Sequence, residues 1–223
     1  LFRSGSNTVE ILANHGVRVG GTDFDRAINI DRVMPLLGKG TELRKMIGPG
    51  SSPVPSAIFN DLATWEKIPF LYTAQNRRMV AEMVRLSLEP QKLGRLFSVL
   101  EDELGHELAF SVERGKIAAN AGNAQSIIVL DQIERGLSCP LSSAEMAQIL
   151  EPYAAKLRIG AQETLTLAGI DNASVRRVVY VGGSSLLSMV SAEMKTQFPD
   201  AEHSFTEVFT AVTDGLALAS ARD

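Results

Sequence analysis

The chain has 223 residues, which suffices for one large domain or two small ones. Hydrophobic residues make up 45% and charged residues 22%, an ordinary globular composition that excludes intrinsic disorder, collagen and coiled coil. A net charge of -4 gives no overall attraction to nucleic acid or anionic lipid, so we expect no nucleic-acid or membrane partner.

Cysteine content and the absence of targeting features indicate the cellular setting. The single cysteine, Cys139, excludes an intramolecular disulfide and, with only three histidines in the chain, argues against a zinc site. All apolar runs are far shorter than the stretch of about 20 residues that spans a bilayer. Residues 1–6 do not resemble a signal peptide, and the first residue is not Met. We therefore expect a cytoplasmic protein of which this chain is a piece.

The first segment predicts a hairpin followed by a helix. Residues 7–13 alternate and include β-branched side chains, residues 14–16 have turn chemistry, and residues 17–19 return as a second strand. The glycine pair at 20–21 comes next, and residues 22–34 begin with a capping-box pattern and continue as an apolar helical stripe. The predicted order is strand, two glycines, helix.

The middle of the chain predicts a loop and then helices. Residues 38–56 are rich in glycine and proline, which indicates a loop and a junction between subdomains. Apolar periodicity predicts helices at 56–65 and 75–88. The same periodicity, continued from 91 to 119, predicts one long helix.

The last part of the chain is typical of an α/β fold. We expect a strand at 126–133, a helix from 142 or 143 to 167, a strand at 178–181, a glycine turn at 182–184, a helix at 186–198, a strand at 202–205 and a closing helix at 206–221. Residues 1–27 and 143–223 should form one subdomain, with strands 7–13 and 178–181 in a common mixed sheet. Residues 28–142 should form an inserted subdomain.

Two features have the chemistry of a nucleotide site. A glycine pair between a strand and a helix lets the backbone approach an anion at the helix N-terminus, and this pattern occurs at 20–21 and at 182–183. Glu113 and Lys116 lie three residues apart on one helix, so their side chains can share the hydroxyls of a ribose. Simple packing turns and a solvated ion pair between Glu113 and Lys116 are the alternative interpretations.

Three stretches together resemble the second lobe of the nucleotide-binding domain of DnaK-type heat-shock chaperones, within the actin and sugar-kinase superfamily. Residues 19–25, Val-Gly-Gly-Thr-Asp-Phe-Asp, are similar to the family's Leu-Gly-Gly-Glu-Asp-Phe-Asp. Residues 112–116 are similar to its Cys-Glu-Arg-Ala-Lys, and residues 178–184 to its strand ending in Gly-Gly-Ser. Residues 61–72 are further similar to the YegD branch of that family.

The resemblance implies a ribonuclease-H-like, actin-type ATPase lobe with an inserted, mostly helical α+β subdomain. In that family the first glycine turn lies near the phosphates, the helical Glu and Lys hold the ribose, and the Gly-Gly-Ser turn lines the path of adenine and phosphates. The family's arginines that enclose adenine correspond to Ile117 and Leu186, and its serine beyond the lysine corresponds to Asn120. The implied nucleotide-binding residues are Gly20, Gly21, Glu113, Lys116, Ile117, Asn120, Gly182, Gly183, Ser184 and Leu186.

The resemblance also implies what this chain needs from elsewhere. The cofactor would be ATP or ADP with Mg²⁺, and the family's other phosphate loop and first lobe would precede Leu1. The family's closing aspartate corresponds to Phe209. Because those upstream segments supply the Mg²⁺ environment, we expect no ATP hydrolysis by this chain alone and assign it no catalytic residue and no metal ligand. Client or co-chaperone proteins are the implied partners.

Two other functions fit the same residues. A sugar or small-metabolite kinase of the superfamily would share this lobe and differ in its substrate site. A third hypothesis is a degenerate nucleotide-binding fold that serves as a protein-interaction scaffold, since Ile117 and Leu186 correspond to the family's arginines. The sequence leaves these alternatives open.

Overall fold

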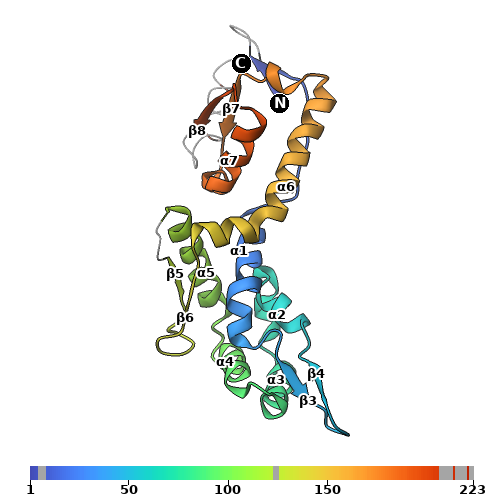
Figure 1. Ribbon diagram of the computed structural model, residues 1–223, viewed down its shortest axis with the longest axis vertical. Coiled ribbons are helices and arrows are strands. Elements are labelled where there is room, and N and C mark those ends of the chain that lie inside the picture. Colours follow the sequence, from blue (N-terminus) through green and yellow to red (C-terminus); the bar gives the residue numbers. More distant parts are fainter. Residues whose placement is uncertain (5–8, 123–125, 206–212, 214–219, 221–223) are drawn as a thin grey trace. The chain divides into compact units, whose positions relative to one another are not determined.

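The computed structural model describes residues 1–4, 9–122, 126–205, 213 and 220, and these residues form a mixed α/β structure (Figure 1). The chain divides into two compact units, one of residues 1–21 and 151–223 and one of residues 22–150. The boundaries expected from the sequence lie after residues 27 and 142. The closing helix predicted at 206–221 and the position of Phe209 lie outside the described residues, apart from 213 and 220.

The first unit begins with a hairpin that differs from the predicted one. Strand β1 (Phe2–Ser4) pairs antiparallel with β2 (Val9–Ile11), whereas described residues 12–20 form neither helix nor strand. The reason is that Leu1 continues the pairing: its carbonyl accepts from the Leu12 amide at 3.0 Å, and its ammonium donates to the Ala13 carbonyl at 2.8 Å. The predicted second strand at 17–19, and with it the first strand–glycine–helix order, is therefore wrong.

A second sheet in this unit joins β7 (Arg177–Tyr180) to β8 (Glu202–Phe205) in parallel, with Val178 opposite His203. Among the described strands, β1–β2 and β7–β8 are separate two-stranded sheets, so the expected common sheet is wrong. All three residues of β2 are exposed, so this strand has no buried face that would pack as part of a larger sheet.

Helices cover the β7–β8 sheet of the first unit. Helix α6 (Ser143–Ala168) enters the unit at Glu151, and α7 (Ser188–Gln197) follows a short helix η5 (Gly183–Leu186); a further short helix, η4 (Asn172–Ser174), precedes β7. The core contains Leu165, Val175 and Phe198, with Val178 packed against them. No helix in the described part of the chain is both long and apolar enough to cross a membrane.

The second unit opens with the predicted helix, which the structure confirms. Helix α1 (Gly21–Ile28) continues into the π-helical η1 (Asn29–Val33) and the 3₁₀ helix η2 (Met34–Leu37). Its apolar stripe is fully or almost fully buried, as the periodicity indicates: Phe24, Ile28, Val33, Met34 and Leu37.

The segment predicted as a loop and junction contains a hairpin. Strands β3 (Glu42–Arg44) and β4 (Ser51–Pro53) pair antiparallel inside the second unit. Gly48 and Gly50 have positive φ angles of 77° and 102°, which lets the connection turn back tightly. The glycines therefore shape a hairpin turn and do not mark a boundary between the units.

The remaining helices of this unit are α2 (Ala57–Leu62), η3 (Trp65–Leu71), α3 (Ala74–Leu86), α4 (Pro90–Glu101) and α5 (Gly105–Asn120). The single helix expected at 91–119 is wrong, because the chain turns between α4 and α5. At this turn Glu103 has a left-handed φ of 56°. The Tyr72 hydroxyl donates to the Glu103 carbonyl at 3.1 Å and accepts from the Gly105 amide at 3.0 Å. Hydrogen bonds of the distant Tyr72 thus stabilise the interruption between α4 and α5, which apolar periodicity does not predict.

Helix α5 packs directly on a small antiparallel sheet of β5 (Ile127–Val129) and β6 (Ser138–Pro140) (Figure 1). A Cβ atom at Gly115 would lie 2.5 Å from Cγ1 of Ile128, so only glycine allows this approach of strand and helix. The described strand is shorter than the predicted 126–133, and β6 was not predicted. The contact fixes which side of α5 faces outward.

Candidate functional site

The predicted residues of α5 share a side of the helix that is turned away from Gly115, its contact with β5. Their spacing of three and four residues places them there together: Glu113, Lys116, Ile117 and Asn120. Glu113 is exposed, Ile117 is 59% exposed and Asn120 is half-buried. Lys116, in contrast, is buried, with only 8% of the residue exposed. This side of α5 therefore combines an accessible carboxylate, an accessible apolar side chain and a sheltered ammonium.

The ammonium of Lys116 has a defined partner within the second unit. Its Nζ lies 2.8 Å from Oδ1 of Asp25 on α1. The alternative interpretation, a solvated ion pair between Glu113 and Lys116, is therefore wrong for the described residues. Removing one partner of a buried ion pair strongly destabilises the folded protein, because the remaining charge is left without a counter-ion. Lys116 and Asp25 therefore depend on each other.

The electrostatics of Asp25 link it to both residues of α5. Burial raises the pKa of the Asp25 carboxyl, while the hydrogen bond and charge of Lys116 lower it and the charge of Glu113 raises it. Asp25 and Glu113 thus influence one another electrostatically, and Asp25 pairs with the Lys116 ammonium. The arrangement is suited to a ligand that both donates and accepts hydrogen bonds, such as a vicinal diol.

Sequence reasoning missed Asp25 as a site residue. The capping-box interpretation placed it near the start of a helix, but α1 begins at Gly21 and Asp25 lies inside it. Neighbouring Phe24 is 1% exposed and anchors this helix in the core. An acidic residue beside a buried aromatic residue was the available signal, but its partner Lys116 lies too far along the chain for local patterns to reveal.

The glycine residues of the candidate site lie in the first unit, where the turns at 20–21 and 182–184 come close to each other. A Cβ atom at Gly21 would lie 3.4 Å from Oγ of Ser184, an ordinary contact distance. Gly182 has a φ of 85°, and its carbonyl accepts a hydrogen bond from the Ser185 hydroxyl at 2.7 Å. No described atom outside the turn lies within 4 Å of a Cβ built at Gly182 or Gly183. The described residues therefore leave space beside this backbone, which is half-buried at Gly182 and exposed at Gly183.

The two residues that the resemblance aligns with adenine-enclosing arginines are both accessible. Leu186, at the end of η5 in the first unit, is 49% exposed, and Ile117 on α5 in the second unit is 59% exposed. Exposed branched side chains can contact a flat apolar ring but cannot form a cation–π interaction with it.

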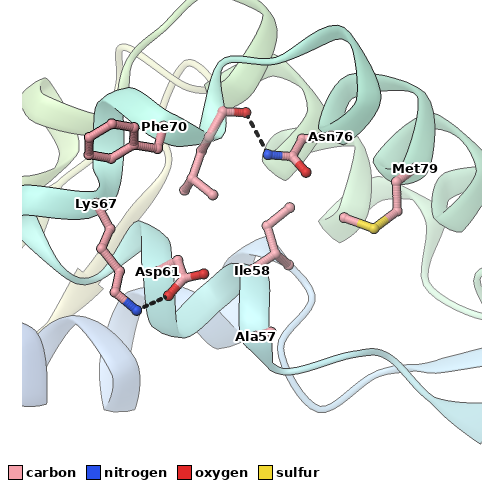
Figure 2. A pocket seen from close by; sticks show the side chains of 8 residues that line it. Ala57, Ile58, Asp61, Lys67, Phe70, Asn76 and Met79 are labelled. Carbon is pink, nitrogen blue, oxygen red and sulfur yellow. Dashed lines mark hydrogen bonds and ion pairs between the residues drawn. The ribbon is translucent and has the colours of Figure 1, made fainter.

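The second unit also contains a surface cavity of about 360 Å³ between α2, η3 and α3 (Figure 2). Its apolar lining includes Ile58, Phe70, Leu71 and Met79. Asp61 and Lys67 at its edge pair at 2.7 Å, so their charges compensate each other. None of the predicted nucleotide-binding residues lines this cavity.

The described residues offer neither a thiolate nucleophile nor a cluster of metal ligands. Burial raises the pKa of the Cys139 thiol to about 11, so this side chain stays protonated near neutral pH. Within residues 1–4, 9–122 and 126–205, no group of three His, Cys, Asp or Glu side chains could hold a metal ion. The Mg²⁺ implied by the resemblance is therefore not assigned to these side chains. A comparison with models of known protein families finds none that matches the chain.

Proposed function

We propose that this chain is the ATP-binding lobe of a chaperone-like ATPase and that the outward side of α5 binds the ribose. The observation that supports this most directly is the Lys116 ammonium, fixed by Asp25 beside the exposed Glu113. A ribose offers two neighbouring hydroxyls, each of which donates and accepts. Lys116 has N–H groups beyond the one directed at Asp25, and the Glu113 carboxylate accepts.

The same proposal assigns the remaining residues. Ile117 would contact the adenine ring, with Asn120 one turn further along α5. Apolar contact in place of an arginine lowers base affinity by about 0.5–2 kcal/mol per ring face. For the first unit we propose phosphate contacts through the backbone of the Gly20–Gly21 and Gly182–Ser184 turns, whose openness at Gly182 and Gly183 supports this.

The finer parts of the proposal follow from the family resemblance. They are an actin-type ATPase fold with an inserted helical subdomain, a cytoplasmic location, Mg²⁺ bound with the nucleotide, and partners that include a first lobe and client or co-chaperone proteins. Phosphoryl transfer requires Mg²⁺ ligands and an oriented water molecule, which we assign to segments other than the described residues. The role of this chain would be to bind and orient the nucleoside.

The test is the affinity of Glu113→Ala for ADP, measured by calorimetry in the natural protein that contains this chain. Losing a charge-assisted hydrogen bond should weaken binding by about 1.5–3 kcal/mol, or about ten- to a hundredfold. Glu107→Ala is the matched control, because Glu107 is an exposed glutamate in the first turn of α5 and lies away from Lys116. Equal affinity of wild type and Glu113→Ala would contradict the proposal.

One observation favours a second candidate function. Ile117 and Leu186 are large apolar side chains exposed to solvent at positions where the resemblance implies adenine-enclosing arginines, which favours contact with another protein over enclosure of an adenine ring. If neither ADP nor ATP binds the wild-type protein, the scaffold becomes the better explanation of this surface.

A further inference from the structure

The buried ion pair between Asp25 and Lys116 points to a residue that sets ligand specificity. We propose that Asp25 is a positioning residue that aims the Lys116 ammonium at an uncharged vicinal diol. This inference rests on the proposed function, because it concerns the ribose contact of α5. Asp25 acts through Lys116, because its Oδ1 lies 2.8 Å from Nζ of the lysine.

Burial makes Lys116 dependent on Asp25. The lysine side chain is only 10% exposed and the aspartate side chain 25%. An unpaired ammonium at this depth would be strongly disfavoured, and a free lysine chain has many rotamers. The carboxylate therefore both stabilises the charge and restricts where the remaining N–H groups point.

The charges around Lys116 select the kind of ligand. Asp25 pairs with Lys116, and Glu113 lies three residues before Lys116 on α5, where its charge raises the pKa of the Asp25 carboxyl, so two carboxylates and one ammonium share this region. A phosphate at this position would face more negative than positive charge and would be repelled. A neutral diol meets no such repulsion, since it accepts from Lys116 and donates to Glu113. The chemical class that fits this side of α5 is thus the sugar of a nucleoside.

A purely structural ion pair makes a different prediction. If Asp25 only joins α1 to α5, its replacement should weaken all ligands of the lobe equally or leave them unchanged. If Asp25 positions Lys116 for a diol, its replacement should weaken only ligands that carry both hydroxyls. Comparing ADP with 2′-deoxy-ADP separates these cases, because the two differ in a single hydroxyl.

The experiment measures the affinities of ADP and 2′-deoxy-ADP for the natural protein containing this chain and for its Asp25→Asn variant. We expect Asp25→Asn to weaken ADP about tenfold and 2′-deoxy-ADP less than about twofold, so that the preference for ADP is lost. Asp31→Asn is the control, because Asp31 lies on the adjoining helix η1 and is 53% exposed beside Arg32. It should keep the wild-type preference.

A second readout follows Lys116 directly and needs no nucleotide. Acylation by an N-hydroxysuccinimide ester, read residue by residue by mass spectrometry, should be slow at Lys116 in wild type and about tenfold faster in Asp25→Asn. Equal acylation in both proteins would overturn the positioning role. If Asp25→Asn does not fold, Asp25→Glu keeps the charge but moves it by one methylene, and it should show a reduced preference for ADP over 2′-deoxy-ADP.

The outcomes separate this inference from the proposed function. If the wild type binds ADP and 2′-deoxy-ADP equally, or binds neither, the ribose site itself is wrong. If the wild type prefers ADP and Asp25→Asn retains that preference, or loses affinity for both ligands alike, the positioning role of Asp25 is overturned while the ribose site stands.

Discussion

The α5 side of the second unit and the glycine turn of the first unit carry the same predicted ligand class but are built differently. On α5, Gly115 meets Ile128 and Lys116 pairs with Asp25, so each position is fixed by distant segments. At Gly182 and Gly183, described atoms outside the turn leave the Cβ positions open, and the positive φ of Gly182 and the hydrogen bonds of Ser185 to its carbonyl shape the turn. Substitutions on α5 should therefore act through packing and charge, and substitutions in the turn through backbone conformation.

The largest effect should come from removing the charge on α5. Lys116→Met leaves the half-buried Asp25 without its counter-ion and should lower the free energy of unfolding by about 3 kcal/mol at pH 7. The double variant Lys116→Met/Asp25→Asn should recover most of that loss, since no buried charge remains. Urea denaturation of the three proteins measures both values. Equal stability of Lys116→Met and wild type would show that the pair is energetically neutral.

The same variant has a defined pH dependence. In wild type the pKa of Asp25 is raised above its unfolded value of 3.8, so its ionisation lowers stability as pH rises through that window. Lys116→Met removes the two influences that lower this pKa, which raises it further. The stability deficit of the variant should therefore grow as pH rises from about 3.8 and shrink again at acid pH, where Asp25 is neutral in both states. A deficit independent of pH would implicate packing instead.

Gly115→Ala tests the close approach of α5 and β5. Because a Cβ there would lie 2.5 Å from Ile128, either the strand or the helix must shift, at a cost of about 1–3 kcal/mol. Gly94→Ala on α4 is the control, since no described atom beyond the chain neighbours and the backbone of its own helix lies within 4 Å of its Cβ position, and alanine favours a helix. The control should be neutral or stabilising in thermal unfolding. A stabilising effect of Gly115→Ala would contradict the packing described for α5.

In the glycine turn, two adjacent substitutions should differ. Gly182 has a φ of 85°, so Gly182→Ala is strained and should destabilise by about 1–2 kcal/mol. Gly183 is not among the positive-φ glycines and has open space around its Cβ, so Gly183→Ala should change stability by less than about 0.5 kcal/mol. Calorimetric unfolding of the pair checks this, and equal effects would mean that packing also shapes the turn.

The smallest effect on stability should come from Glu113→Gln. Its side chain is exposed, so the free energy of unfolding should change by less than about 0.5 kcal/mol. Removing its negative charge should also lower the pKa of Asp25, which nuclear magnetic resonance can follow. An unchanged Asp25 pKa would show that Glu113 lies too far away to share a ligand with Lys116.

Local periodicity predicted the helices whose apolar stripe runs through one continuous segment of the chain. The helix predicted at 75–88 is α3 (Ala74–Leu86), and the helix predicted to end at 167 is α6 (Ser143–Ala168). It failed where a distant segment decides the structure. The continuous stripe from 91 to 119 conceals a turn that Tyr72 holds, and the hairpin partner of β2 is the segment at Leu1.

For the candidate site, the sequence by itself determined which side chains share one side of α5, because helical spacing fixes that from residue numbers alone. It also determined the α/β character and the presence of a glycine turn before α7. Only the tertiary structure decided that Lys116 is buried and pairs with Asp25 and not with Glu113. The physical reason is that desolvation and charge pairing depend on which distant segments meet, and spacing within one helix carries no information about that.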